Sequence, residues 1–198
     1  ACDPSACDLG CLTEALTDAD RDAGHHVSGR DWDVPSCRAI EAEYWRTLNL
    51  GMPPMYGADQ QGTLFDDRTT QWNVGTLDSL LSRTLKCALP GVTTPYLYFG
   101  MWRASFAWHV EDMDLYSINY IHFGAPKQWY AIRQADRKRF ESVMASTFPA
   151  EARKCAHFLR HKSFLVSPSV LASHGIQPLR LVQHAHECVS TYPVGDHS

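Results

Sequence analysis

The spacing of hydrophobic positions changes along the chain and divides it into three parts. Residues 1–35 are rich in Asp, Gly, Ser and Cys and show no sustained period, which predicts a flexible lead-in. Over residues 36–48 apolar side chains recur near helical spacing behind the candidate N-cap Ser36, so an amphipathic helix is expected. A second helix is expected over residues 76–83. With the Pro- and Gly-rich loop between the helices, residues 36–90 are expected to form a segment that packs on the rest of the chain.

Short strand patterns dominate residues 91–198. Aromatic and β-branched residues gather there in runs that Gly, Pro or Asp residues separate, as is typical of strands. The runs cover residues 95–102, 105–110, 115–123, 128–132, 163–167 and 188–194. Helices are expected over about residues 134–147 and 151–158. Together these patterns predict a mainly β fold with appended helices, a double-sheet barrel of the cupin or jelly-roll kind.

Composition and charge narrow the class of protein. The 198 residues, of which 44% are hydrophobic and 11% aromatic, suffice for one domain with a substantial core. A net charge of −4 and a pI near 6.2 provide no basic stripe, so direct sequence-specific binding of nucleic acid is not expected. No apolar run is long enough to span a membrane, and no secretory leader opens the chain. The absence of a Gly-rich phosphate loop and of a GxSxG turn argues against nucleotide-binding and serine-hydrolase functions.

Cysteine usage points to a reducing compartment. Seven cysteines, an odd number at irregular spacings, favour reduced thiols or metal ligands over a secreted disulfide framework and predict an intracellular protein. Cys2, Cys7 and Cys11, followed by His25 and His26, could bind a metal. Their spacing matches no standard zinc pattern, so ordinary thiols are the favoured interpretation.

A histidine and an acid, His109 and Glu111, lie in a stretch that is otherwise apolar and aromatic. If the strand over residues 105–110 continues, alternation places both side chains on one face, where a distant second histidine would complete a facial triad for Fe(II). With ten His and 22 acids, chance gives about one such pair, so a hydrogen-bonded pair at a sheet edge is the alternative. Asn119 lies among apolar neighbours on the next strand. Lys127 follows a Gly and Pro turn, where it could meet an anionic cosubstrate or remain solvated.

A long stretch over residues 93–130 resembles a known family. This stretch, with "YGAD" at 56–59, "FLRHK" at 158–162 and "TYP.G.H" at 191–197, is similar to the core of JmjC-domain histone lysine demethylases. The similarity extends over about residues 44–197 and is closest to fungal members of the subfamily acting on di- and trimethyl-lysine of histone H3. It implies a double-stranded β-helix and an Fe(II)- and 2-oxoglutarate-dependent demethylation that releases formaldehyde and succinate. A histone H3 tail as partner and a nuclear location are implied as well.

The resemblance also implies roles for individual residues. The implied iron ligands are His109, Glu111 and His197. The implied 2-oxoglutarate contacts are Tyr56, Asn119, Lys127 and Lys162, with Phe106 and Trp129 as walls of that pocket. The implied methyl-lysine pocket includes Gly91 and Tyr98. Cys155 and His161 correspond to the first half of a zinc site, whose other two ligands are cysteines expected after the last residue of this chain.

The carboxy-terminal motif departs from the family pattern. The family reads something like "GEFMITYPYGYH", whereas this chain has "HECVSTYPVGDH". His186 therefore replaces Gly, Cys188 replaces Phe, and Val194 and Asp196 replace Tyr. Asp196 is expected either to perturb the iron site or to face solvent, since neighbours along a strand point to opposite faces.

Two further departures leave alternatives open. The chain is expected to be truncated after the third iron ligand, without the strand that closes the barrel, and residues 1–35 have no counterpart of the family's amino-terminal JmjN module. The alternative function is a catalytically inactive JmjC-like module for chromatin or protein interaction, and an iron-dependent protein hydroxylase is a third possibility. The basic run over residues 133–139 and the remaining histidines, among them His122, are expected to be surface or ordinary core residues.

Overall fold

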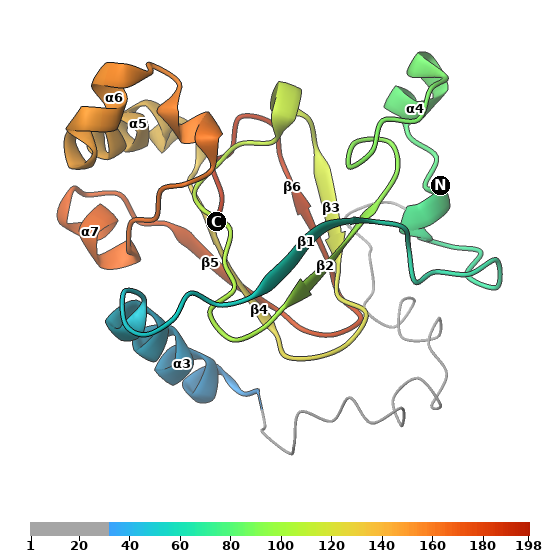
Figure 1. The fold of residues 1–198 in the computed structure, drawn as a ribbon, viewed down its shortest axis with the longest axis horizontal. Helices are drawn as coiled ribbons and strands as arrows, with labels where there is room; N and C mark the ends of the chain where they lie inside the picture. Colours follow the sequence, from blue (N-terminus) through green and yellow to red (C-terminus); the bar gives the residue numbers. More distant parts are fainter. Residues whose placement is uncertain (1–31) are drawn as a thin grey trace.

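The computed structural model describes residues 32–198 (Figure 1). The lead-in predicted for residues 1–35, except its last four residues, and the cysteine cluster within it lie outside the described residues. Among the described residues, no helix is both long enough and apolar enough to cross a membrane.

Within residues 32–198, five helices and four 3-10 turns surround the strands. They are α3 (Val34–Thr47), α4 (Leu80–Leu85), α5 (Arg137–Thr147), α6 (Pro149–Lys154), α7 (Pro168–Ser173), η2 (Val74–Thr76), η3 (Asp112–Asp114), η4 (Gln134–Asp136) and η5 (Phe158–His161). Helix α3 begins two residues before the predicted start, because the Asp33 side chain accepts a hydrogen bond from the Ser36 backbone N–H at 2.8 Å and caps it. Helices α5, α6 and α7 gather on one side of the strands, and α3 lies below them (Figure 1).

In the described part of the chain, six strands form three antiparallel pairs. The strands are β1 (Tyr56–Gln61), β2 (Tyr96–Gly100), β3 (Ser117–Tyr120), β4 (Lys127–Ala131), β5 (Leu179–Gln183) and β6 (Cys188–Thr191). Strand β1 pairs with β2, β3 with β6, and β4 with β5. His197 adds single bridges to His109 and to Ala131, so the end of the chain joins the β4–β5 pair to the segment around His109. The described strands do not close into a barrel, so the expected jelly-roll arrangement is present in part.

Two predicted strands are wrong. Residues 105–110 contain only an isolated bridge at His109. The Trp108 N–H donates to the Phe164 carbonyl at 3.0 Å, whereas the His109 N–H donates to the His197 carbonyl at 3.0 Å. His109 is the one residue of this segment with a bridge partner, so no ladder of consecutive pairs extends there. Residues 163–167 do not form a strand either, and their Phe164 and Val166 side chains pack on the core.

Two observed strands were not predicted. Strand β1 lies in a stretch with the composition of a loop and becomes extended because it pairs with β2. Strand β5 follows Pro178 and holds two exposed leucines and Val182 within five residues, an apolar run that is typical of a strand. The remaining predicted strands exist as β2, β3, β4 and β6, each with shifted ends.

The hydrophobic core is formed by side chains from α5, α7, the end of β4 and the segment around Trp108. Its fully buried side chains include Trp108, Phe140, Met144, Leu171 and Ile176. The Trp108 indole N–H donates to the carbonyl of Val166 at 3.0 Å. Since Trp108 is fixed in the core, the next residue, His109, has its side chain directed away from that core, toward the strands.

Candidate metal centre and its pocket

Three side chains from distant parts of the chain converge on one point. His109, Glu111 and His197 each offer one ligand atom, and these atoms all lie within 4.8 Å of one another. Nε2 of His197 is 3.4 Å from Oε1 of Glu111, and the two imidazole rings are 4.4 Å apart between centroids. The structure thus brings together the three residues expected to be iron ligands.

Backbone pairing holds the two histidines side by side. The His109 N–H donates to the His197 carbonyl at 3.0 Å, and the His197 N–H donates to the His109 carbonyl at 2.9 Å. Nδ1 of His109 lies 2.8 Å from the Ala107 carbonyl, and Nδ1 of His197 lies 3.1 Å from the Gly195 carbonyl. A carbonyl oxygen can only accept, so Nδ1 carries the proton and the Nε2 lone pair is available for a metal.

The protonation states of the triad suit a cation. Burial, reinforced by the nearby His197, lowers the pKa of His109 to about 4. The close approach of the His197 imidazole is the largest cause that lowers the pKa of Glu111 to about 2. At neutral pH the site therefore offers a neutral His109 imidazole and an ionised carboxylate, the forms that bind metal ions.

Lys127 forms the centre of an aromatic cluster next to the triad. Its Nζ lies 4.5 Å from the ring centroid of Phe106 and 4.4 Å from that of Trp129. The Tyr56 ring is 5.1 Å from the Phe106 ring, so these four residues are contiguous. Burial lowers the pKa of Lys127 to about 8, which leaves a mostly protonated ammonium at neutral pH in surroundings that favour an anion.

The other two expected cosubstrate contacts lie in different settings. Asn119 is on β3 opposite Val189 of β6, and its carbonyl accepts a hydrogen bond from Nε2 of Gln183 at 3.1 Å. Lys162 follows η5 with a left-handed backbone, and its Nζ is 3.6 Å from Oδ1 of Asp112 at the surface. Asn119 is therefore tied to the strand framework, whereas Lys162 is engaged in an exposed ion pair.

Gln183 is a site residue that sequence analysis missed. It is fully buried, and its Oε1 accepts a hydrogen bond from the Trp129 indole N–H at 2.8 Å. Through this bond and its bond to Asn119, it joins two residues expected to line the cosubstrate pocket. The sequence contained one signal for this residue. Gln183 follows Leu179 and Leu181 at every second position, so it places a polar side chain on an otherwise apolar face.

Tyr98 borders the aromatic cluster, and Gly91 lies behind it. The Tyr98 ring is 5.4 Å from the Phe106 ring, and its hydroxyl donates to Oδ1 of Asp59 at 3.0 Å. Gly91 has φ +74°, and a Cβ there would lie 2.5 Å from Cε2 of Tyr96. Glycine is therefore required for the close packing of this loop on Tyr96, whose ring neighbours Tyr98 at 6.5 Å.

Cys155 and His161 lie at the ends of short helical turns. Cys155 is half-buried after α6, and His161 is exposed at the end of η5. Within residues 32–198, the His109, Glu111 and His197 group is the one set of three such ligands with converging atoms. The described residues therefore supply no third ligand close to Cys155 and His161.

Asp196 does not face solvent, so that part of the sequence-based expectation is wrong. The residue is 3% exposed, and its Oδ2 is buried without a hydrogen-bond partner among the described residues. Its carbonyl accepts from the Ile132 N–H at 2.8 Å, so it is held within the sheet. Burial raises the pKa of Asp196 to about 6. An acid thus replaces a family aromatic residue beside His197 in a setting that does not stabilise its charge.

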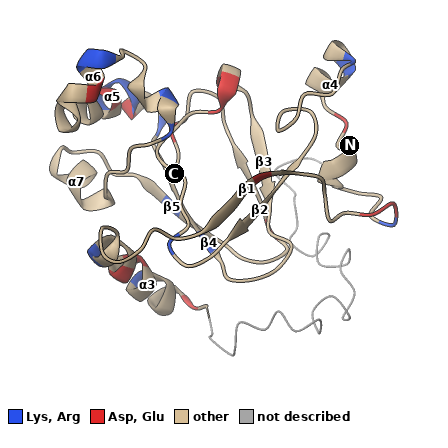
Figure 2. Cartoon of the chain, in the orientation of Figure 1, with Lys and Arg blue, Asp and Glu red and all other residues tan. Residues whose placement is uncertain are grey.

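The remaining histidines and the basic run have ordinary surroundings. The His122 ring packs between Phe65 at 4.7 Å and Tyr120 at 4.9 Å, and burial lowers its pKa to about 4. In the basic run, Arg137 forms an ion pair with Glu141 at 2.9 Å. Figure 2 shows charges of both signs on α5 and α6, as expected for solvated helices.

Val194 occupies a strained position in the turn that leads to His197. The Gly195 N–H donates to the Tyr192 carbonyl at 3.3 Å, and Val194 has φ +65° at the third position. A turn with Pro193 second and a positive φ third has the pattern of a type II turn, which favours Gly or Asn there. A β-branched residue in this region costs about 1–2 kcal/mol.

Replacing Val194 by Gly is therefore expected to stabilise the fold by about 1 kcal/mol, which raises Tm by about 2–4 °C for a chain of this size. Thermal unfolding followed by circular dichroism measures the change. The control is Val194→Ala, which keeps a Cβ and should gain little. An unchanged or lower Tm for Val194→Gly would show that the valine turn is relaxed.

Comparisons with known proteins agree with the geometry. A family model described as "JmjC domain, hydroxylase" matches residues 96–198. Over 162 residues, or 80% of this chain, the sequence is 50% identical to Lysine-specific demethylase 4D of Rattus norvegicus and 49% identical to Lysine-specific demethylase 4B of Mus musculus. It is also 49% identical to Probable lysine-specific demethylase 4F of Homo sapiens. The matched region spans 32%, 15% and 25% of the length of these relatives, respectively.

Proposed function

Because the chain belongs to the JmjC-domain family, we propose that it is an Fe(II)- and 2-oxoglutarate-dependent dioxygenase that demethylates a lysine of the histone H3 tail in the nucleus. The observation that carries the proposal is the convergence of two imidazoles and one carboxylate within 4.8 Å. The names of the relatives, lysine-specific demethylases, support the choice of reaction.

The donor set fits a ferrous ion. Two Nε2 atoms and one ionised carboxylate are the donors of a facial triad, which leaves open positions on the metal. A ferrous ion held by His109, Glu111 and His197 would supply the chemistry of oxygen reduction coupled to decarboxylation of 2-oxoglutarate. A methyl group oxidised in this way leaves as formaldehyde, and 2-oxoglutarate becomes succinate and carbon dioxide.

The neighbouring residues would bind and orient the two organic substrates. The Lys127 ammonium would pair with the far carboxylate of 2-oxoglutarate, and the Tyr56 hydroxyl would donate a hydrogen bond to the same group. Phe106 and Trp129 would exclude water from this pair, with Asn119 and Lys162 as further polar contacts. The Tyr98 ring would receive the methylated ammonium, and Gly91 would support the pocket through its packing on Tyr96.

A second candidate function is a JmjC-like interaction module without activity. The buried Asp196 carboxylate and the strained Val194 favour it, because both replace family aromatic residues next to an iron ligand. A protein hydroxylase on the same scaffold is a third candidate, in line with the wording of the matched family model. A zinc site at Cys155 and His161 is a further proposal, and it requires two additional ligands.

The proposal is tested by formaldehyde release from a trimethyl-lysine H3 peptide with iron and 2-oxoglutarate. Demethylation that stops in a His109→Ala variant is the expected result. Metal binding without turnover would favour the interaction module, and succinate formation without demethylation would favour the hydroxylase.

A further inference from the structure

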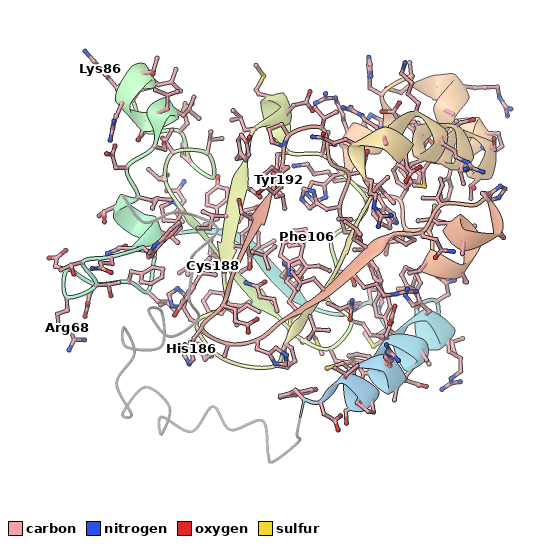
Figure 3. All side chains as sticks on the ribbon, turned by 180° about the vertical axis from the view of Figure 1, so that it is seen from behind. Arg68, Lys86, Phe106, His186, Cys188 and Tyr192 are labelled. Atoms are coloured by element: carbon pink, nitrogen blue, oxygen red, sulfur yellow. The ribbon has the colours of Figure 1, made fainter. Side chains whose placement is uncertain are left out.

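Gln183 at the end of β5 is held by three hydrogen bonds in the interior of the protein. Its side chain is fully buried, and its Oε1 accepts from the Trp129 indole N–H at 2.8 Å. Its Nε2 donates to the Asn119 carbonyl at 3.1 Å and to the Glu187 carbonyl at 2.8 Å. Glu187 lies in the turn between β5 and β6, which carries the labelled His186 in Figure 3. One amide therefore ties β5 to β4, to β3 and to the turn before β6.

The donors and acceptors around this amide fix its orientation. An indole N–H only donates and a backbone carbonyl only accepts, so Oε1 must face Trp129 and Nε2 must face the two carbonyls. A turned amide would place its oxygen against the carbonyl oxygens and leave the indole N–H unpaired, which is costly in a fully buried position. The Gln183 side chain is therefore a rigid anchor for the edge of the indole ring.

The face of the same indole contacts Lys127. Nζ of Lys127 lies 4.4 Å from the centroid of the Trp129 ring, and the His197 ring lies 6.1 Å from that ring. In the register of β4 and β5, Lys127 is directly opposite Gln183, so these two side chains share one face of the pair. An indole that turned about its side-chain bonds would remove the aromatic face next to the ammonium. The Gln183 amide can therefore act on Lys127 through Trp129.

We propose that Gln183 is a positioning residue, which holds the Trp129 indole so that the Lys127 ammonium meets the far carboxylate of a bound 2-oxo acid. The inference rests on the proposed function, because that function supplies the 2-oxo acid. Both protons of Nε2 are already donated and the side chain is fully buried, so Gln183 acts on the ligand indirectly. The expected signature is selectivity: Gln183 strengthens binding of 2-oxo acids that have a far carboxylate and does not affect those that lack it.

The experiment measures the Kd of the full chain, with Mn²⁺ bound, for two 2-oxo acids. 2-Oxoglutarate has the far carboxylate, and 2-oxopentanoate has a methyl group in its place. Water-proton relaxation by the bound Mn²⁺ reports the binding of either acid. Gln183→Met keeps the length of the side chain without its hydrogen bonds, and it is expected to weaken 2-oxoglutarate binding by about 10-fold. Binding of 2-oxopentanoate should change by less than about twofold.

Two further variants show whether the amide acts through the indole. Trp129→Phe keeps an aromatic ring but has no N–H for Oε1. It should also weaken 2-oxoglutarate binding by about 10-fold, and adding Gln183→Met to it should cost less than about twofold more. Gln128→Leu is the matched control, because Nε2 of Gln128 donates to the backbone carbonyls of Trp129 and Leu181 at 3.2 and 3.3 Å. Losing these bonds leaves the indole anchored, so both affinities should stay within about twofold.

Failure of the inference and failure of the proposed function give different results. Folded Gln183→Met that kept its 2-oxoglutarate affinity, or lost affinity for both acids equally, would overturn the inference and leave the proposed pocket standing. Losses that multiply in the double variant would show that Gln183 does not act through Trp129. If the unchanged chain bound neither acid in the presence of Mn²⁺, the proposed function itself would fail, and the inference with it.

Circular dichroism of each variant checks that the strands are intact. If Gln183→Met does not fold, Trp129→Phe decides, because it removes the same hydrogen bond from the other side. Weaker binding of 2-oxoglutarate alone would then support the inference, and unchanged binding would overturn it.

Discussion

Replacing His197 by Ala is expected to abolish tight metal binding and to lower demethylation by at least about 10³-fold. The variant loses one of three donors, and Glu111 loses its 3.4 Å contact with the imidazole. The fold should survive, because the bonds that join this segment to His109 are backbone bonds at 3.0 and 2.9 Å, and alanine keeps them. The loss should therefore reflect chemistry rather than unfolding.

Metal content of the purified variant and formaldehyde release give the two measurements. His174→Ala is the matched control, since this histidine is exposed after α7 and is not in the triad. The control should retain both metal binding and turnover. Full activity in the His197→Ala variant would exclude the triad as the reaction centre.

Replacing Lys127 by Met is expected to have opposite effects on cosubstrate binding and on stability. Affinity for 2-oxoglutarate should fall by about 10²-fold, because the ammonium between Phe106 and Trp129 is the cation expected to meet its carboxylate. The protein without cosubstrate should become more stable by about 1–2 kcal/mol near neutral pH, since burial disfavours the charge that the variant lacks.

The sign of the stability effect depends on pH. Burial lowers the pKa of Lys127 from 10.5 in the ordinary side chain to about 8. Below about pH 8 both the folded and the unfolded chain carry the proton, so the folded state bears the full cost of the buried charge. Between pH 8 and 10.5 the unfolded state binds more protons, so the free energy of unfolding rises with pH. The Lys127→Met variant should lack this rise.

Urea unfolding at several pH values, with 2-oxoglutarate titrations at pH 7, tests both parts. Lys138→Met on the exposed surface of α5 is the matched control and should change neither quantity. A Lys127→Met variant that is less stable at pH 7 would show that the aromatic contacts of the ammonium outweigh its burial. Unchanged cosubstrate affinity would remove Lys127 from the proposed pocket.

The sequence predicted elements wherever local signals agree. Helical spacing over residues 36–48 locates α3, although its cap is Asp33 and not the candidate Ser36, and the aromatic runs locate β2, β3, β4 and β6. Residues 105–110 are rich in aromatic and apolar residues in the same way, and yet they form no strand. Strand propensity describes side chains that suit a pleated surface, whereas a strand also needs one continuous partner. In this segment only His109 has a bridge partner, and no local pattern reveals that.

Local sequence was sufficient to mark the short-range chemistry: the His109 and Glu111 spacing and the aromatic strands. The meeting of these two residues with His197 and the burial of Asp196 come from the tertiary structure alone. The physical reason is that a residue's local conformation depends on its near neighbours. Which distant segments pair depends on the summed weak contacts of the whole chain, so these sites exist only once it has folded.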